Sequence, residues 1–453
     1  MNAAVKRVSL PELSKLEPEP CVSDDVYVRR QERLRARMRD AGIEILAVYA
    51  DREHSANASY LTGFDPRFEE ALVLLSHEGA IVIAGNESIS LVPGLPGAPI
   101  AVLCQAFSLP GQDRSVCATL EDALVVAGVA QTASLGVVGW KPMASTGSGR
   151  GMSVPGFVID GLTAHLRTRP IDLTDWLCGL DGARTEVEAD QIALHEHRAT
   201  RASGHVWRAL EALAPGRSEL ELTCAMQLTG LPQACHVMCT SGADTVNGLR
   251  SPGDRVLGYG DRFSVAVGLW GGLCSRAGRL LTHDDPELAA HADGLIAPYV
   301  AAQRQWYESL RIGADAGEIT RNVVARLAER GLRPLLNPGH FVHLDEWVHS
   351  PFTVDSQVRL RSGMALQCDI IPVGPDPGAA ANCEDSLAIA DSDLRAELRE
   401  RFPTMWTRVL ARREFMESEL GIALGPEVLP LSDRQGALPA GLLSLEYVVD
   451  PEG

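Results

Sequence analysis

Short apolar runs of four to eight residues recur through the first third of the chain. Each run is bounded by Gly, Pro, Asn or Asp, and stretches of helical period separate them. Runs of this length with such boundaries are typical of buried strands. Their alternation with helices predicts an α/β domain over residues 25–178. The runs are Ile43–Ala50, Ala71–Leu75, Ala80–Ala84, Ile100–Cys104 and Leu135–Trp140.

Residues 179–453 follow another pattern, in which longer helical periods alternate with strand-like runs. A long amphipathic helix is predicted from Glu188 to about Leu213, where Pro215-Gly216 ends it. Further helices are predicted at 218–228, 287–312, 316–331 and 394–420, and strands at 234–240, 261–269, 364–372 and 383–389. This order predicts an α+β domain. Residues 1–24, which are rich in Pro and charge, are predicted to form a separate N-terminal arm.

The overall composition restricts the class of partner. The 453 residues carry 59 acidic and 41 basic side chains and a formal net charge of -18. Such a chain repels nucleic acid and anionic membrane surfaces, so we expect a small molecule or a peptide as its partner. The ten cysteines form no CxxC pair, which is typical of reduced, cytoplasmic proteins. The first residues do not resemble a signal peptide, and no apolar run approaches the roughly 20 residues that span a bilayer.

Three residues stand out as candidates for chemistry. His340 follows a glycine at the start of a strand-like run, and Asp369 and Glu384 lie in or beside two later apolar runs. A histidine and two buried acids can build a metal site or an acid–base site. From these residues alone both possibilities remain open.

The order of several motifs resembles the pita-bread superfamily of creatinase, prolidase, aminopeptidase P and methionine aminopeptidase. The segment Ala58–Phe64 is similar to part of the creatinase-type N-terminal domain. The resemblance implies a creatinase-type α/β domain followed by a pita-bread α+β domain, and it covers nearly the whole chain. The motifs of the second domain are Arg184–Glu188, Pro215-Gly216 with Glu219, Ser241-Gly242, Gly260-Asp261, Gly339-His340 with Asp345, Gly363-Met364 with Asp369, and Glu384-Asp385.

Metallopeptidases of this superfamily hold two metal ions, and the resemblance carries three of the five ligand positions onto His340, Asp369 and Glu384. Of the two aspartate positions, the first falls on Ala266. The second falls on Arg276, or on Ala277 if the intervening turn is not shortened. Neither alternative can ligate a cation. A guanidinium about 4 Å from a divalent ion would cost roughly 8 kcal/mol at an effective dielectric near 20. We therefore expect no metal and no other cofactor.

The resemblance implies a metal-independent, creatinase-like hydrolase, or a lyase, of a small polar C–N compound such as an amidino, amide or cyclic amidine substrate. His340 would be the general acid–base, and Asp369 and Glu384 would orient the substrate and water. Arg276 would lie between these carboxylates or bind a substrate carboxylate. The catalytic histidine of creatinase has no counterpart after Ser241-Gly242. Two alternatives stay open: a single-metal Xaa-Pro type dipeptidase on His340, Asp369 and Glu384, or a non-catalytic ligand- or peptide-binding protein.

Four further residues are candidates for substrate binding. His343 and His349 follow His340 closely, as a second histidine often does in the superfamily. Arg67 and Phe68 follow the Gly63-Phe64 motif, in a loop that reaches the partner subunit's pocket in creatinase-type dimers. The resemblance therefore predicts a homodimer in which Arg67 and Phe68 contact that pocket.

Overall fold

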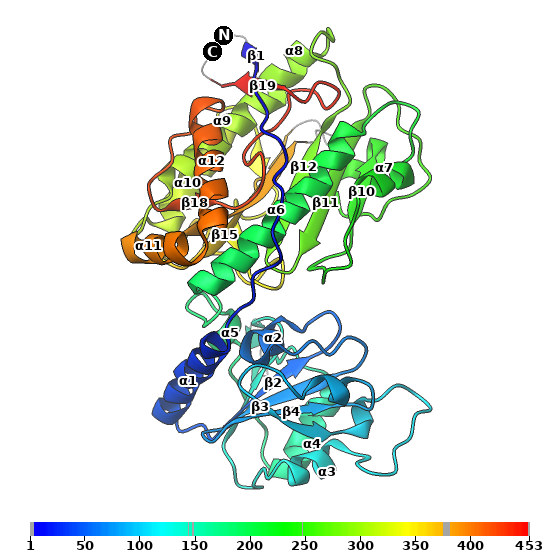
Figure 1. Cartoon of the computed structure of the whole chain (residues 1–453), viewed down its shortest axis with the longest axis vertical. Coiled ribbons are helices and arrows are strands. Elements are labelled where there is room, and N and C mark those ends of the chain that lie inside the picture. Colours follow the sequence, from blue (N-terminus) through cyan, green and yellow to red (C-terminus); the bar gives the residue numbers. More distant parts are fainter. Residues whose placement is uncertain (1–3, 144, 147–148, 247, 375–380, 452–453) are drawn as a thin grey trace. The chain divides into compact units, whose positions relative to one another are not determined.

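The computed structural model describes residues 4–143, 145–146, 149–246, 248–374 and 381–451. The chain divides into two compact units (Figure 1). Cys21–Thr185 form the N-terminal unit. Met1–Pro20 and Glu186–Gly453 together form the C-terminal unit. The first 20 residues, predicted to be a separate arm, therefore belong to the C-terminal unit.

The N-terminal unit is built on one mixed sheet. β2 pairs in parallel with β6 and antiparallel with β3, as expected for an α/β unit with one hairpin. In sheet order the strands are β5 (Ile100–Leu103), β4 (Ala80–Ala84), β3 (Ala71–Leu75), β2 (Ile45–Ala50), β6 (Leu135–Val138) and β9 (Ile171–Asp172). A short hairpin, β7 (Ser145–Thr146) and β8 (Gly149–Arg150), lies outside this sheet.

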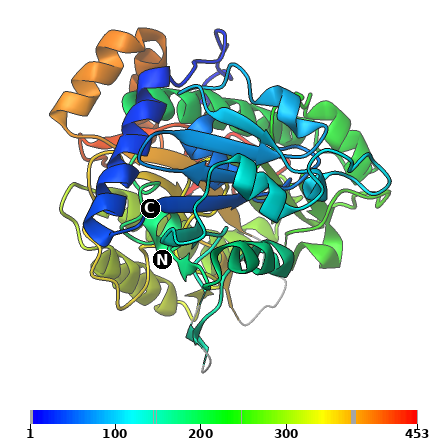
Figure 2. The same cartoon turned by 90° about the horizontal axis from the view of Figure 1, so that it is seen from below.

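Helices cover this sheet because its strands are buried apolar runs. α3 and α4 lie against the sheet (Figure 2). They share one apolar core with it, in which Leu124 and Leu162 pack with Tyr49 and Leu72. α1 ends at Gly42, whose φ of 67° is costly for residues with a side chain. The helices are α1 (Asp24–Ala41), α2 (Ala56–Thr62), α3 (Leu120–Val126), α4 (Gly156–Leu166) and α5 (Asp175–Cys178), with 3-10 turns at Ser88–Leu91 and Gln105–Phe107.

The C-terminal unit contains an antiparallel sheet whose middle strands are buried on both faces. In sheet order the strands are β10 (Met238–Ser241), β11 (Arg262–Leu269), β12 (Gly272–Arg279), β17 (Asn382–Ile389), β15 (Ala365–Cys368) and β14 (His340–Phe341), with β18 (Val428–Pro430) also paired to β17. β13 (Arg333–Pro334) pairs separately with β16 (Pro372–Val373). This sheet positions the candidate site.

Two predicted helices of this unit are interrupted. The 394–420 helix is broken before Pro403, because proline cannot donate the backbone hydrogen bond that would continue it. The 287–312 helix contains a π-helical turn at Ala292–Ile296. The helices are α6 (Ala189–Glu211), α7 (Glu219–Ala225), α8 (Leu288–His291), α9 (Ala297–Ser309), α10 (Ala316–Ala328), α11 (Ser392–Arg401) and α12 (Pro403–Ser418), with a 3-10 turn at Gly242–Val246.

The N-terminal segment runs along α6 (Figure 1). Its strand β1 (Ala4–Arg7) pairs with β19 (Tyr447–Asp450). Further along, Arg408 of α12 contacts Glu17 at 2.7 Å, and Arg198 of α6 contacts Glu19 at 2.7 Å. The segment thus covers the outer side of α6, which explains why this helix is buried nearly all round although its sequence is amphipathic.

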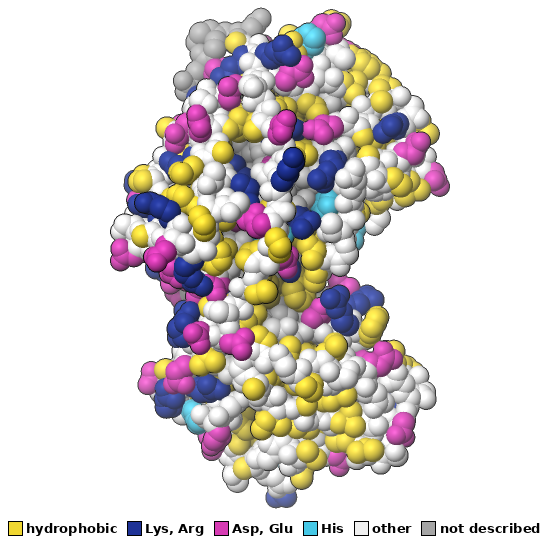
Figure 3. Space-filling view, viewed as in Figure 1, with side chains coloured by type: hydrophobic (Ala, Val, Ile, Leu, Met, Phe, Trp, Pro, Cys, Tyr) yellow, Lys and Arg dark blue, Asp and Glu magenta, His cyan; other side chains and the backbone are white. Residues whose placement is uncertain are grey.

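The surface differs between the two units. Figure 3 shows acidic and basic side chains interspersed over the C-terminal unit, whereas hydrophobic side chains gather over the visible face of the N-terminal unit. Within the described residues, no helix combines the length and apolarity that crossing a membrane requires.

Candidate active site

Neighbouring strands of the C-terminal sheet bring the three candidate residues together. Cys368 of β15 lies opposite Asp385 of β17. Asp369 and Glu384, one residue further along this antiparallel pair, therefore lie opposite each other. His340 of β14 lies opposite Gln367 of β15, two residues before Asp369. Residues opposite each other on antiparallel strands, and residues two apart on one strand, project from the same face. His340, Asp369 and Glu384 therefore share one face of the sheet.

Gly339 makes this approach possible. Its φ is 138°, and a Cβ atom there would lie only 2.7 Å from the carbonyl oxygen of Gln367. Any larger residue would push β14 away from β15. The Gly-His pair of the motif thus sets how closely His340 approaches its neighbours.

Glu346 joins the cluster, which the sequence analysis did not predict. Nε2 of His340 lies 3.3 Å from Oε1 of Glu346 and 3.6 Å from Oε1 of Glu384. The ring of Trp347 stacks on the imidazole, with 4.1 Å between ring centroids. Glu346 and Trp347 directly follow the motif residue Asp345. An acidic and an aromatic residue this close to His340 in the sequence could have indicated that they contact it.

Several buried polar atoms of the cluster make no hydrogen bond to any described residue. His340 is fully buried, and Asp369 and Glu384 are 5% and 7% exposed. Among the residues that the structure describes, Oδ1 of Asp369, Oε1 of Glu384 and Nε2 of His340 make no hydrogen bond. Each such buried atom costs about 1–3 kcal/mol. Atoms like these are expected where a ligand or ion supplies the missing contacts.

Burial and mutual contacts raise the pKa values of three residues of the cluster. Burial raises the pKa of the Asp369 carboxyl well above its ordinary value, and the nearby Glu384 raises it further. Burial likewise raises the pKa of Glu384, although His340 offsets part of this effect. Burial by itself would lower the pKa of His340, but Glu346 and Glu384 raise it well above its ordinary value. The site can therefore both donate and accept protons.

Arg276 does not lie where the sequence analysis placed it. In the β12–β17 pair, Arg276 lies opposite Cys383, whereas Ser275 lies opposite Glu384. The side chains of Arg276 and Glu384 therefore project from opposite faces of the sheet. The prediction that Arg276 lies between the carboxylates of Asp369 and Glu384 is wrong, because strand register directs its side chain away from them.

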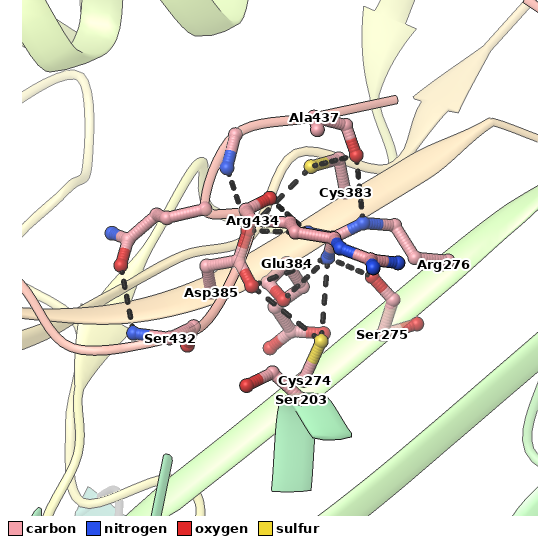
Figure 4. A network of polar contacts seen from close by, with 12 residues as sticks. Ser203, Cys274, Ser275, Arg276, Cys383, Glu384, Asp385, Ser432, Arg434 and Ala437 are labelled. Carbon is pink, nitrogen blue, oxygen red and sulfur yellow. Dashed lines mark hydrogen bonds and ion pairs between the residues drawn. The ribbon is translucent and has the colours of Figure 1, made fainter. Parts of the chain in front are cut away.

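The guanidinium of Arg276 is instead part of a buried network (Figure 4). Its Nη2 lies 2.8 Å from Oδ2 of Asp385, and both side chains are fully buried. Nε donates to the carbonyl oxygen of Ala437 at 2.9 Å, and Nη1 donates to that of Ser275 at 2.7 Å. With its donors engaged and no exposed surface, Arg276 cannot bind a substrate carboxylate.

Comparisons with known proteins bear on this geometry. Residues 196–391 match the model of metallopeptidase family M24. Among solved structures, the chain is similar to dipeptidase PepE from Mycobacterium ulcerans, with 19% identity, a TM-score of 0.60, and coverage of 82% of this chain and 94% of that one. It is also similar to the prolidase from Pyrococcus horikoshii OT3, with 17% identity, a TM-score of 0.61, and coverage of 80% of this chain and 95% of that one. An Xaa-Pro dipeptidase from Bacillus anthracis is similar as well, with 16% identity, a TM-score of 0.61, and coverage of 81% of this chain and 96% of that one. A search of curated proteins found no match.

The chain has the pita-bread fold, and residues 196–391 resemble metallopeptidase family M24. The resemblance found in the sequence is confirmed, as is the fold class of an α/β creatinase-type domain followed by an α+β pita-bread domain. In this pita-bread sheet, Ala266 lies opposite Ser275, and Ala277 lies two residues along the same face. Ala266, Ser275 and Ala277 therefore project toward the side that carries Glu384.

His343 and His349 contact residues other than His340, Glu346 and Glu384. His343 is fully buried, and its ring meets that of His195 of α6 edge to face, with 5.4 Å between centroids. Its Nδ1 accepts the backbone N–H of Leu344 at 2.9 Å. Nδ1 of His349 accepts the N–H of Ser350 at 2.8 Å. These contacts assign both histidines local structural roles, and their predicted part in substrate binding stays a prediction.

Arg67 and Phe68 lie in a tight turn of the N-terminal unit. Arg67 has a φ of 61°, and its Nε lies 2.8 Å from Oδ2 of Asp65. Phe68 is 69% exposed, which is unusual for a large aromatic side chain. Their predicted contact with a partner subunit stays a prediction.

Proposed function

We propose that this chain hydrolyses a C–N bond in a small polar compound at the cluster of His340, Asp369 and Glu384. The observation that carries the proposal is the set of buried, unpartnered atoms that these residues direct to one face of the sheet. Buried titratable groups with perturbed pKa values are typical of catalytic sites. The amidino, amide and cyclic amidine substrates expected from the sequence remain the proposed substrate class.

The proposed site lacks a two-metal centre. The positions where the superfamily pattern expects aspartates carry Ala266 and, from the strand register, Ala277. Methyl groups cannot ligate a cation, and divalent ions in carboxylate sites need several anionic oxygens. The residues present therefore do not fit a binuclear centre, and no step of the proposed reaction uses one.

The cluster can supply the proton transfers that hydrolysis requires. His340, whose pKa is raised by Glu346 and Glu384, would carry the proton that passes to the leaving nitrogen. Glu384 would accept a proton from the attacking water, since burial makes its carboxylate more basic. Asp369, whose pKa burial raises well above its ordinary value, would donate a hydrogen bond to the substrate in its protonated form. Arg276, expected to bind a carboxylate, has no role in this scheme.

A second candidate is an Xaa-Pro type dipeptidase that uses one metal ion on His340, Asp369 and Glu384. The unpartnered atoms of these residues favour it, because they are one nitrogen and two carboxylate oxygens. The prolidase and Xaa-Pro dipeptidase among the similar structures support the same substrate class. A bound ion would polarise the scissile carbonyl, while the protein positions the substrate.

A substrate panel tests the proposal. Amides, amidino compounds, cyclic amidines and Xaa-Pro dipeptides are incubated with the full chain, before and after chelator treatment, and amine or ammonia release is measured. We expect turnover of one class, with a loss of at least about 100-fold in His340→Gln. Turnover of an amidino, amide or cyclic amidine substrate that survives chelation supports the metal-independent form.

Cleavage of Xaa-Pro dipeptides that chelation abolishes and one ion per chain restores supports the second candidate. Absence of turnover across the panel, together with ligand binding that His340→Gln leaves unchanged, would contradict the proposal and favour a non-catalytic binding protein.

A further inference from the structure

A large cavity lies in the C-terminal unit, at the end of the β11–β12 pair where β11 begins and β12 ends. Its volume is about 780 Å³, which is in the range of sites for small molecules. The loop before β11, the strands β11 and β12, the helix α8 and the π-helical turn after it all contribute to the lining. The proposed reaction uses none of the residues that line this cavity.

The lining of the cavity is basic, although the chain as a whole has a formal net charge of -18. Among the described residues that line it, the arginines Arg255, Arg262 and Arg279 outnumber the acids Asp261 and Glu287. Arg262 lies directly opposite Arg279 in the β11–β12 pair. Like charges at such positions destabilise a sheet. An anion bound between the guanidinium groups would offset this repulsion.

The guanidinium of Arg255 is held in a defined orientation. Its Nε donates to Oγ of Ser241 at 3.0 Å, and its Nη2 lies 3.1 Å from Oδ2 of Asp261. Gly242 leaves room for this group, because a Cβ atom at residue 242 would overlap it. Within the described part of the chain, Nη1 of Arg255 makes no hydrogen bond, and the side chain is 45% exposed. Arg255 can therefore donate to a ligand without losing its present contacts.

Arg279 is similarly available to a ligand. Its Nε donates to the carbonyl oxygen of Gly260 at 3.3 Å, and its Nη2 lies 2.8 Å from Oε2 of Glu287. Nη1 makes no hydrogen bond to a described residue. The side chains of Arg279 and Glu287 are 28% and 65% exposed. Ion pairs this exposed contribute little free energy, so an anion can compete with Glu287 for the guanidinium.

The rest of the lining indicates which kind of anion fits. Leu295 and Leu332 give the cavity apolar walls, together with Ala243 and Ala290. A cavity with apolar walls and a few oriented polar donors is typical of sites for organic molecules. Guanidinium groups bind carboxylates and phosphates through paired hydrogen bonds. The combination therefore suits an organic anion better than an inorganic ion.

The cavity and the catalytic cluster share one face of the sheet, but they are separate. Ser275 of β12 lies opposite Glu384, and Arg279 follows four residues later on the same strand. At about 3.4 Å per residue, the backbones of Ser275 and Arg279 are about 14 Å apart. A small ligand can therefore occupy the cavity while His340 and Glu384 remain accessible to substrate.

We infer that this cavity binds a small organic anion that carries carboxylate or phosphate groups. Arg255 and Arg279 are its main hydrogen-bond donors, and Arg262 adds positive charge beside Arg279. The inference goes beyond the proposed hydrolysis and does not depend on it, because binding at the cavity requires no residue of the catalytic cluster.

Calorimetric titration of the full chain with phenyl phosphate and with phthalate, at low ionic strength, tests the inference. We expect one bound anion per chain, with affinity at least about tenfold lower in Arg279→Gln and in Arg255→Gln. Glu287→Gln should raise the affinity, since it removes a carboxylate that competes for Arg279. Arg359→Gln is the matched control, because it removes an exposed arginine that is paired with Asp315 in the same unit. It should bind both anions as the wild type does.

Dimethyl phthalate, the neutral counterpart of phthalate, should not bind. His340→Gln should bind both anions with unchanged affinity, which would show that the cavity is separate from the catalytic cluster. Circular dichroism confirms that each variant is folded. Failure of the wild-type chain to bind either anion overturns the inference, and so do equal affinities in Arg279→Gln, Arg255→Gln and Arg359→Gln. Loss of anion binding in His340→Gln also overturns it, because the anion would then occupy the catalytic cluster.

Discussion

Arg276 illustrates at the scale of single residues how a buried charge can be structural rather than functional. Its guanidinium and the Asp385 carboxylate are both fully buried and 2.8 Å apart. The backbone N–H of Gly436 also donates to Asp385, at 2.9 Å. Removing one partner of such a pair leaves the other charge buried without compensation. The pair therefore links β12 and β17 to the C-terminal segment around residue 436.

We expect Arg276→Ala to lower the free energy of unfolding by roughly 3–5 kcal/mol. The double variant with Asp385→Ala should lose less than the sum of the single variants, because neither charge is then left unpaired. Urea denaturation measures both. Arg279→Ala, which breaks a partly exposed pair with Glu287, is the control and should cost at most about 1 kcal/mol. A loss in Arg276→Ala no larger than in this control would contradict the structural role.

Strand register also predicts which substitutions can rebuild a two-metal centre. Ala266 and Ala277 project from the face that carries Glu384, and Arg276 does not. Ala266→Asp with Ala277→Asp should therefore raise the number of Mn²⁺ ions bound per chain, measurable by calorimetric stoichiometry. Ala266→Asp with Ala277→Asn is the matched control, and it should add no ion. Equal stoichiometry in the two double variants would mean that the register assignment is wrong.

At the scale of elements, α6 shows how other segments change the environment of a helix. Glu196 on α6 is fully buried, and it contacts Arg408 and Arg412 of α12, each at 2.6 Å. Toward the other end of the helix, Nδ1 of His205 lies 2.9 Å from the carbonyl oxygen of Met226, just after α7. These polar contacts join α6 to its neighbours, so the helix carries buried charges that its amphipathic pattern does not reveal.

His205 predicts a pH dependence of stability. Burial lowers its pKa below the ordinary 6.5, and Arg208 and Arg201 lower it further, although the contact with Met226 opposes this. Near and below pH 6.5, His205 therefore binds a proton more readily in the unfolded chain than in the folded chain. As a result, this residue reduces the free energy of unfolding as the pH falls from about 7.5 toward 5.5. His205→Gln should flatten that part of the slope in urea denaturation. His77→Gln, at an exposed position, should leave the slope unchanged, and equal slopes in all three proteins would contradict the prediction.

At the scale of the whole molecule, the N-terminal unit exposes many large apolar side chains. Figure 3 shows hydrophobic side chains over the visible face of this unit. Phe68 is 69% exposed, and Ile100, Val116 and Val126 are 64%, 77% and 69% exposed. Extended apolar surface of this kind is typical of protein–protein interfaces. It supports the homodimer expected from the sequence, which stays a prediction.

We expect sedimentation at micromolar concentration to give a species of about twice the 48.6 kDa chain mass. Phe68→Ser should shift the equilibrium toward the monomer, because an exposed aromatic side chain in an interface contributes strongly to binding. Leu410→Ser, at an exposed apolar position of the C-terminal unit, is the control. A wild-type monomer at these concentrations would contradict both the dimer and the interface role of Phe68.

Local patterns in the sequence were sufficient to predict the superfamily, the fold class and three members of the cluster. Strand-like runs, the Gly339-His340 pair and the spacing of Asp369 and Glu384 are short-range features, since backbone preferences and motif spacing depend on neighbouring residues. The break in the helix at Pro403 could also have been predicted, because the effect of proline on a helix depends only on its position in the local sequence. The packing of the N-terminal segment on the C-terminal unit could not have been predicted in this way, since its partners are about 180 and 390 residues away in the sequence.

Only the tertiary structure decided which residues face the cluster. Shifting a strand by one residue turns each side chain to the opposite face, so motif matching alone could not assign Arg276 or Ala277 to the side of Glu384. Glu346 joins His340 through the path of a loop, and no strand pattern specifies that path. The sequence by itself thus determines which residue types the site contains. The orientation of their side chains depends on strand register and loop conformation, and contacts between distant segments determine both.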